Sequence, residues 1–108
     1  MEPGAIDFAQ IENISNKIVR EIHPEKVILF GSHARGNQTT DSDVDLIVVN
    51  KTNLPKHKRS IEIRRLFFRK AIPMDIKVYT PDEFEKERIN RFSFLNSVLK
   101  ESKVLYER

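Results

Sequence analysis

Three aspartates stand where two predicted strands begin, and their spacing is the strongest chemical signal in the sequence. Asp43 and Asp45 flank Val44 at the start of a strand predicted over residues 43–49. Because strand side chains alternate between faces, both carboxylates project the same way, roughly 7 Å apart along the strand. Asp75 opens the next predicted strand, and neighbouring strands lie about 4.8 Å apart, so a suitable register brings its carboxylate beside the other two.

A cluster of three carboxylates favours a bound cation. Like charges at this spacing repel and raise one another's pKa unless a cation neutralises them. Hard oxygen ligands that leave room for water and phosphate suit Mg²⁺. The alternative interpretation is that Asp75 is a solvated residue at a strand end, a usual place for an aspartate. That alternative is weaker for Asp43 and Asp45, because two acids at the start of a buried strand lower its β-propensity.

Residues 31–36 predict a turn that can hold an anion. A short apolar strand over residues 26–30 ends at Gly31, and Ser32 begins one helical turn that Gly36 would stop. Free backbone N–H groups at a helix start stabilise an anion, glycine lets the backbone approach closely, and Ser32 adds a hydroxyl donor. Taken alone, a Gly-Ser turn of this kind is more often structural than functional.

Two other motifs match only in part and are rejected. Gly31 and Gly36 have the glycine spacing of a P-loop, but Asn37-Gln38 stands where the lysine and hydroxyl residue are required. The segment that starts at Asp41 resembles an EF-hand loop, but Leu46 replaces its glycine and Thr52 stands at the bidentate glutamate position. The sequence therefore predicts neither a Walker-type ATPase nor a calcium loop.

The elements that must position these residues follow from apolar periodicity and helix signals. The pattern predicts a core-packing helix capped by Asp7, strands at 26–30, 43–49 and 74–79, a helix over 55–71, a helix starting at Thr80, a further helix carrying Phe92, Leu95, Val98 and Leu99, and a strand or docked tail at 104–106.

Connection lengths predict how the strands pair. A helical crossover between the second and third strands favours a parallel pair, whereas the shorter link between the first and second allows an antiparallel one. The predicted fold class is α/β in the α+β sense, with a small mixed β-sheet backed by helices.

Composition limits what the chain can be. Its 108 residues suit one domain over 1–108, and the absence of cysteine with three scattered histidines argues against disulfides, thiol nucleophiles and a zinc cage. A formal net charge of +3 attracts polyanions only mildly, so direct nucleic-acid binding is not expected. No signal peptide or membrane span is recognisable, so we expect a cytoplasmic protein without membrane contact.

Taken together, the motifs resemble a known family. Gly31-Ser32, ten intervening residues, Asp43-Val44-Asp45 and a later Asp75 are similar to the nucleotidyltransferase superfamily of DNA polymerase beta. More narrowly, Gly-Ser-His-Ala-Arg-Gly followed by Ser42-Asp43-Val44-Asp45-Leu46 resembles the minimal nucleotidyltransferases, whose chains are about this long. The resemblance runs from the first helix to the tail, and no expected catalytic position is missing.

The resemblance implies a polymerase-beta-like nucleotidyltransferase fold and a role for each motif residue. Asp43, Asp45 and Asp75 would be the catalytic residues. Asp43 and Asp45 would bind two Mg²⁺ ions, and Asp75 would join them at the catalytic metal. Gly31 and Ser32 would hold the nucleoside triphosphate, with ATP as the expected substrate.

The resemblance also implies an acceptor supplied from outside, since a chain of this size has no second domain to hold one. Minimal members are commonly paired with a small helical HEPN ribonuclease toxin, and some neutralise it by adenylylating a tyrosine. We therefore expect a protein adenylyltransferase that acts as an antitoxin, in a homo- or hetero-oligomer. The alternatives are nucleotidylation of a small molecule such as an aminoglycoside, and an antitoxin that blocks its partner by binding alone.

Other polar residues carry weaker hypotheses. Lys77 shares the face of Asp75 and could contact phosphate or pair with an acid, and Arg35 could reach the nucleotide, the partner or a helix end. His33 and His57 are given no catalytic role. The basic residues between positions 56 and 70 are interpreted as a solvated helix face, with a partner or RNA contact as the alternative.

Overall fold

A mixed four-stranded sheet in the order β3-β2-β1-β4 forms the centre of the computed structural model, which describes residues 6–108. The strands are β1 (Lys26–Phe30), β2 (Val44–Val49), β3 (Met74–Tyr79) and β4 (Lys103–Glu107). The pairs β1–β2 and β1–β4 are antiparallel, and β2–β3 is parallel. Both strand pairings expected from the connection lengths are confirmed, and the closing segment forms a strand at the sheet edge.

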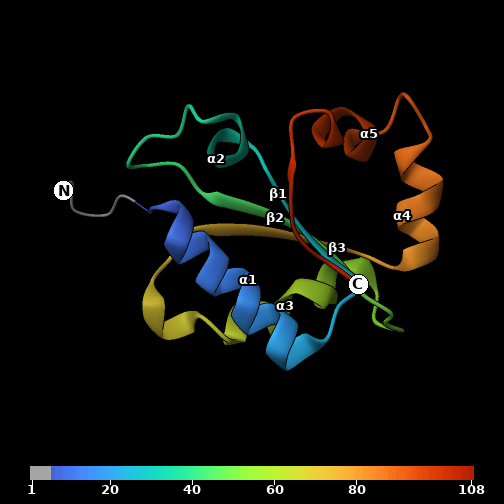
Figure 1. Ribbon diagram of the computed structural model, residues 1–108. Coiled ribbons are helices and arrows are strands. Elements are labelled where there is room, and N and C mark those ends of the chain that lie inside the picture. The colour runs from blue at the N-terminus through green and yellow to red at the C-terminus, as the bar shows by residue number, and fades with distance from the viewer. Residues whose placement is uncertain (1–5) are drawn as a thin grey trace.

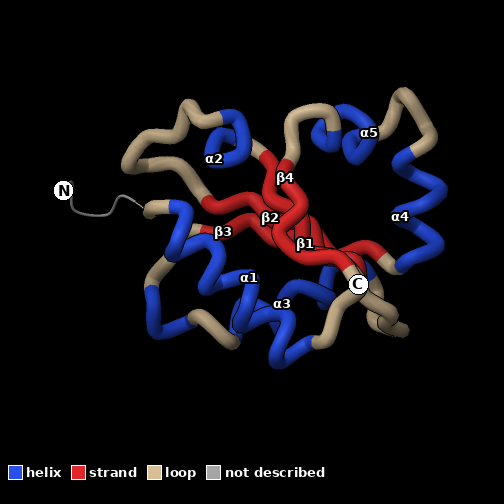
Figure 2. Tube along the Cα trace, viewed as in Figure 1, coloured by secondary structure: helices blue, strands red, loops and turns tan. Residues whose placement is uncertain are grey.

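Helices cover both faces of this sheet, and they lie on opposite sides of it in Figures 1 and 2. Helices α1 (Phe8–Ile22) and α3 (Arg59–Arg65) cover one face, and α4 (Pro81–Arg88) and α5 (Phe94–Leu99) cover the other. The short helix α2 (Ser32–Arg35) follows β1 directly. Within residues 6–108, no helix combines the length and the apolar character needed to span a bilayer.

Local signals explain where the helices begin. At α1, the Asp7 carboxylate accepts from the N–H of Gln10, and the Gln10 side chain accepts from the N–H of Asp7. At α4, Thr80 and Glu83 form the same reciprocal capping box, with Pro81 at the first helical position. Such boxes satisfy two of the donors that a helix start leaves free. The predicted starts of both helices are confirmed.

The two sheet faces bury separate apolar clusters, which we call the α1 core and the α5 core. Alternation along each strand sends every second side chain to one of them. The α1 core contains Ile11, Ile14, Ile18, Val27, Leu29, Val44, Leu46, Val48, Ile63, Phe67 and Ile76. The α5 core contains Ile28, Phe30, Ile47, Val49, Phe84 and Leu95.

The helix predicted over residues 55–71 is wrong in extent. The segment divides into a 3-10 turn at Lys56–Lys58, the seven-residue α3, and a second 3-10 turn at Phe68–Lys70. Phe67 N–H donates to Arg64 O three residues back, which tightens the chain and lets Phe67 enter the α1 core. Pro73 follows shortly and disfavours a continued helix.

Two smaller expectations also need correction. Phe92, assigned to the last helical stripe, precedes α5 and is exposed, because Ser93 caps that helix and accepts from Asn96 N–H. The basic segment is not wholly a solvated face. The Arg59 side chain is only 9% exposed and donates to both carboxylate oxygens of Glu83.

Candidate active site

The register of three strands places two of the predicted aspartates side by side. Asp45 in β2 is the partner of Phe30 in β1 and of Asp75 in β3, so the three residues form one row across the sheet. Val44 and Leu46, the neighbours of Asp45, are buried in the α1 core, so Asp45 faces the opposite side. Residue 43, expected inside the strand, lies just before it.

Gly31 allows the turn after β1 to lie against the Asp45 carboxylate. Its backbone has φ +76° and ψ −159°, a conformation that side chains other than glycine rarely adopt. A Cβ built on Gly31 would stand 2.1 Å from Asp45 Oδ2. Only glycine therefore fits here, and Ser32, the next residue along the chain, is the first residue of α2.

His33 fixes α2 to the start of β2. Its side chain is buried, and Nδ1 lies 3.0 Å from the backbone oxygen of Asp43. A carbonyl oxygen only accepts, so Nδ1 carries the proton and donates it. No sequence pattern predicted this bond, since a lone histidine in a turn is usually a surface residue. His33 holds the predicted phosphate-binding turn in place against Asp43.

Asp45 lies in surroundings that disfavour its ionised form. Burial raises the pKa of Asp45, and the negative charges of Asp75 and then Asp43 raise it further, while His33 and Lys77 act in the opposite direction. Lys77 Nζ lies 3.7 Å from Asp75 Oδ2 and neutralises only part of this charge. Carboxylates held together at such a cost are stabilised by a bound cation.

The residues present fit a magnesium site that substrate completes. Among residues 6–108, no three histidine, aspartate or glutamate side chains converge into a preformed metal cage. Mg²⁺ does not require one, because it commonly takes one or two protein carboxylates and fills its octahedron with water and phosphate oxygens. The carboxylates offer only oxygen ligands, and the raised pKa of Asp45 shows that its negative charge is not neutralised by the protein alone. Both features match that chemistry.

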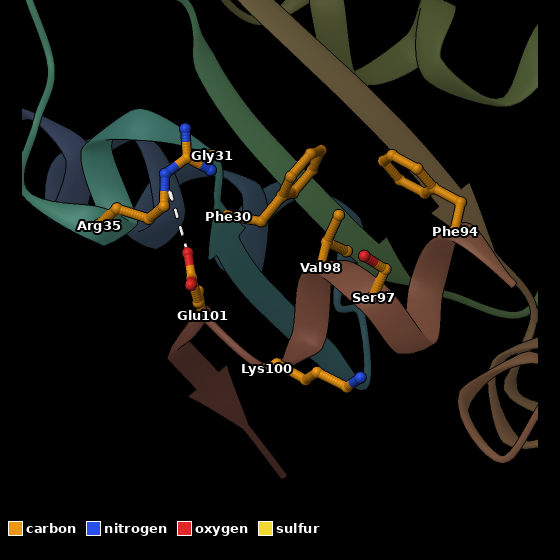
Figure 3. Close-up of a pocket in the computed structure, with 8 residues that line it drawn as sticks. All are labelled: Phe30, Gly31, Arg35, Phe94, Ser97, Val98, Lys100 and Glu101. Carbon is orange, nitrogen blue, oxygen red and sulfur yellow. Dashed lines mark ion pairs between the residues drawn. The ribbon is translucent and has the colours of Figure 1, made fainter. Parts of the chain in front are cut away.

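A cavity of about 490 Å³ opens beside Gly31 (Figure 3). Phe30, Phe94 and Val98 form its apolar part. Its polar lining comes from α2 and from the end of α5, and Arg35 points toward Glu101 with Nε 3.8 Å from Oε2. The polar residues are Arg35, Ser97, Lys100 and Glu101.

An aromatic pair joins this cavity to the aspartate row. The rings of Phe30 and Phe94 meet edge to face, with centroids 5.8 Å apart and planes at 85°. Lys77 Nζ lies 5.3 Å from the centre of the Phe94 ring. Phe94 was missed in the sequence because periodicity selected Phe92; the signal that could have found it is Ser93, a good N-cap residue directly before it.

Comparison with known proteins assigns the family. The polymerase beta nucleotidyltransferase family matches residues 12–108. The chain therefore belongs to this family of nucleotidyltransferases. The family and enzyme class predicted from the motifs are confirmed, and the roles of Asp43, Asp45, Asp75, Gly31 and Ser32 remain predictions.

Individual relatives agree with this assignment. A Methanocaldococcus jannaschii protein provisionally named a protein adenylyltransferase is 35% identical over 83 residues, which cover 76% of this chain and 78% of the relative. A Sulfolobus solfataricus protein provisionally named a nucleotidyltransferase superposes with TM-score 0.63 at 22% identity, covering 93% of this chain and 83% of its own.

A second solved structure is a toxin–antitoxin with AMP-PNP. It superposes with TM-score 0.63 at 24% identity and covers 90% of this chain and 73% of its own. At these identities both structural matches show the fold, and they confirm the predicted α+β polymerase-beta-like architecture.

Proposed function

We propose that this chain is a Mg²⁺-dependent nucleotidyltransferase that moves AMP from ATP onto a hydroxyl of a partner protein. The partner is a small helical HEPN ribonuclease toxin, and the transfer neutralises it, so the chain acts as a cytoplasmic antitoxin. The observation that carries the proposal is the row of Asp45 beside Asp75, with Gly31 packed against Asp45. This arrangement supports the proposal because one triphosphate could then contact both carboxylates and the turn that we expect to bind its phosphates.

Each of the predicted site residues has a distinct role in the transfer. Asp43 and Asp45 would hold the magnesium ions, which would supply positive charge to stabilise the transferred phosphate. Gly31 and Ser32 bind the triphosphate through backbone N–H groups and a hydroxyl. Asp75, whose side chain is 45% exposed, faces the incoming acceptor and accepts its proton.

The bond changes balance in a single displacement. The acceptor oxygen forms a bond to the α-phosphorus of ATP, and the bond from that phosphorus to the pyrophosphate oxygen breaks. Pyrophosphate leaves with the electron pair, and the acceptor proton passes to the Asp75 carboxylate. Positioning and charge stabilisation account for most of the catalysis in reactions of this class.

The cavity beside Gly31 takes the nucleoside. Its volume of about 490 Å³ lies within the range of small-molecule sites, and its mixture of aromatic walls and a few polar groups is typical of them. Phe94 offers a ring face or edge for the base, and Ser97 and Lys100 add polar groups to the lining of the cavity.

The nature of the acceptor is supported by the relatives. The Methanocaldococcus jannaschii relative is named for adenylyl transfer to protein, and the AMP-PNP structure is of a toxin–antitoxin. Transfer onto a partner also suits a carboxylate row whose last member, Asp75, is accessible from outside.

Intact-mass measurement tests the proposal. The full chain is incubated with ATP, Mg²⁺ and the HEPN-type protein of the same organism, and both proteins are weighed by mass spectrometry. We expect one or more AMP additions on the partner, and none with EDTA or with the Asp43→Asn/Asp45→Asn variant. A stable complex with no adduct from any nucleoside triphosphate would contradict catalysis and favour neutralisation by binding; transfer to an aminoglycoside instead would move the acceptor class to small molecules.

A further inference from the structure

The connection between α4 and α5 exposes large apolar side chains to an unusual degree. Phe92 is 84% exposed, Ile89 is 71% exposed and Phe94 is 49% exposed. We call residues 89–94 the elbow. A large apolar side chain left fully in water forgoes about 1.5–3 kcal/mol of burial free energy, so one isoleucine and two phenylalanines exposed to this extent within six positions indicate a surface that another molecule covers.

The elbow is held in one conformation by hydrogen bonds. Ser93 Oγ donates to the backbone oxygen of Glu87 at 2.6 Å, and Asn96 Nδ2 donates to that of Arg88 at 2.7 Å. Asn90 Oδ1 accepts from the N–H of Phe92 at 3.0 Å. The apolar side chains are therefore presented by a fixed backbone, which lowers the entropy lost when a partner binds.

The elbow is continuous with the candidate active site. Its last residue, Phe94, packs edge to face on Phe30, which is the strand partner of Asp45. Lys77 Nζ lies 5.3 Å from the centre of the Phe94 ring and 3.7 Å from Asp75 Oδ2. A protein seated on the elbow would therefore have its neighbouring surface over the aspartate row.

The charge on the elbow adds chemical detail. The guanidinium of Arg91 lies 4.9 Å from the centre of the Phe92 ring and forms no ion pair with another residue of the described chain. Aromatic and arginine side chains are the commonest energetic anchors of protein interfaces. A partner that covers Phe92 must also meet this cation.

We propose that the elbow is the docking surface for the acceptor protein, which presents an apolar surface flanked by a carboxylate that pairs with Arg91. The inference rests on the proposed function for the identity of the acceptor. In this proposal the partner is recognised by Ile89, Arg91 and Phe92. ATP binds separately, in the cavity beside Gly31.

A matched control lies elsewhere on the molecule. Phe68 is 74% exposed and has the guanidinium of Arg69 at 5.4 Å from its ring centre, so it repeats the Phe92–Arg91 arrangement. Its segment, the 3-10 turn Phe68–Lys70, follows α3 directly after Phe67 of the α1 core, and in Figure 1 this part of the chain lies on the side of the sheet covered by α1 and α3, opposite α4 and α5. Removing Phe68 changes exposed apolar surface by a similar amount without touching the elbow.

The experiment compares Phe92→Ser, Ile89→Ser and Phe68→Ser in the full chain. The dissociation constant for the HEPN-type protein is measured by calorimetry, in the active chain and with Asp43→Asn/Asp45→Asn added, and ATP binding and AMP transfer are measured separately. We expect Phe92→Ser and Ile89→Ser each to weaken partner binding by about tenfold or more, with unchanged ATP affinity, and Phe68→Ser to have no effect. Arg91→Glu should slow association.

The outcomes separate docking from chemistry. Loss of binding in the elbow variants without any AMP adduct in the wild type would support the elbow and contradict the proposed transfer. Normal binding and normal transfer in Phe92→Ser and Ile89→Ser would overturn the elbow while leaving the transfer intact. Failure of the wild-type chain to bind the partner, or a dimer that Phe92→Ser converts to a monomer without affecting the partner, would also overturn it.

Discussion

The two faces of the sheet differ in what they hold, although the same strands build both. Along β2, Val44, Leu46 and Val48 enter the α1 core. On the opposite face, Ile47 and Val49 enter the α5 core, but Asp45 at the strand start does not. One face is apolar along the whole strand, whereas the other changes from apolar to charged within two residues.

The difference shows how a small domain accommodates a charged site. The α1 core supplies most of the burial, so the start of the second face can hold carboxylates that repel one another. Burial and the neighbouring aspartates raise the pKa of Asp45, which means that its ionised form destabilises the fold in the absence of a cation. The two faces should therefore respond in opposite ways to substitution.

The largest expected effect is on activity, at the charged end of the second face. Asp45→Asn should lower the rate of AMP transfer by about a thousandfold, because the carboxylate proposed to hold the magnesium ion is lost. The same change should raise the melting temperature measured without metal, since it removes a charge that the fold disfavours. Stopped assays of AMP transfer and calorimetry of the metal-free protein check the two parts.

Asp41→Asn is the control for that substitution. Asp41 is exposed in the loop before β2 and lies outside the row. It should change neither the transfer rate nor the melting temperature. If Asp45→Asn lost stability or kept full transfer activity, the two faces of the sheet would not differ in the way described above.

The next effect is on stability, one residue further along β2. Leu46→Ala should lower the free energy of unfolding by about 3 kcal/mol, because Leu46 is fully buried and its loss leaves a cavity in the α1 core. The activity of each folded molecule should remain near that of the wild type. Denaturant titration and activity at a temperature well below the transition measure the two quantities, and a specific loss of activity would show that the faces are coupled.

A pair of glycines tests the close approach at the site. Gly31→Ala should lower the transfer rate by about a hundredfold, since its Cβ would overlap the Asp45 carboxylate and displace it. Gly36 also has a positive φ, of +81°, but a Cβ added there has no neighbour within 4 Å. Gly36→Ala is therefore the control. It should cost about 1 kcal/mol of stability through backbone strain and leave the rate nearly unchanged. Equal rates in the two variants would contradict the proposed turn.

Much of this architecture could be predicted from the sequence because the signals were local. The capping box at Thr80, the glycines around α2 and the alternation around Asp45 each specify a conformation within a few residues. The position of Asp75 could not be predicted without the register between β2 and β3. In the observed parallel pairing, the register places Asp75 beside Asp45.

The features that could not be predicted depend on contacts between distant residues. The bond from His33 to Asp43 and the packing of Phe94 on Phe30 have no local pattern. The helix expected over 55–71 is interrupted after α3, where Phe67 is buried in the α1 core. The free energy of burying Phe67 exceeds the local preference for a continuous helix. Tertiary packing of this kind overrides local propensity.

The smallest effect concerns the bond that ties the two faces together around the sheet edge. Arg59 at the start of α3 donates to the Glu83 carboxylate in α4 and also to the backbone oxygen of Val78 in β3. The hydrogen bond from Arg59 lowers the pKa of Glu83 from its ordinary value of 4.5 to about 2. Because the folded-state pKa is depressed, the stabilisation is fully present above pH 4.5 and is lost as the pH falls through about 2.

Replacing Glu83 should therefore remove a pH-dependent part of the stability. Glu83→Gln should lower the free energy of unfolding by about 2 kcal/mol at neutral pH and flatten its decline between pH 4.5 and 2. Glu85→Gln is the matched control, since Glu85 pairs with Arg88 on the exposed surface of the same helix and surface pairs contribute little. Urea titrations at several pH values measure both variants. If the two glutamates behaved alike, α4 would be held on the sheet by the α5 core alone, and the α1 and α5 layers would be independent at this edge.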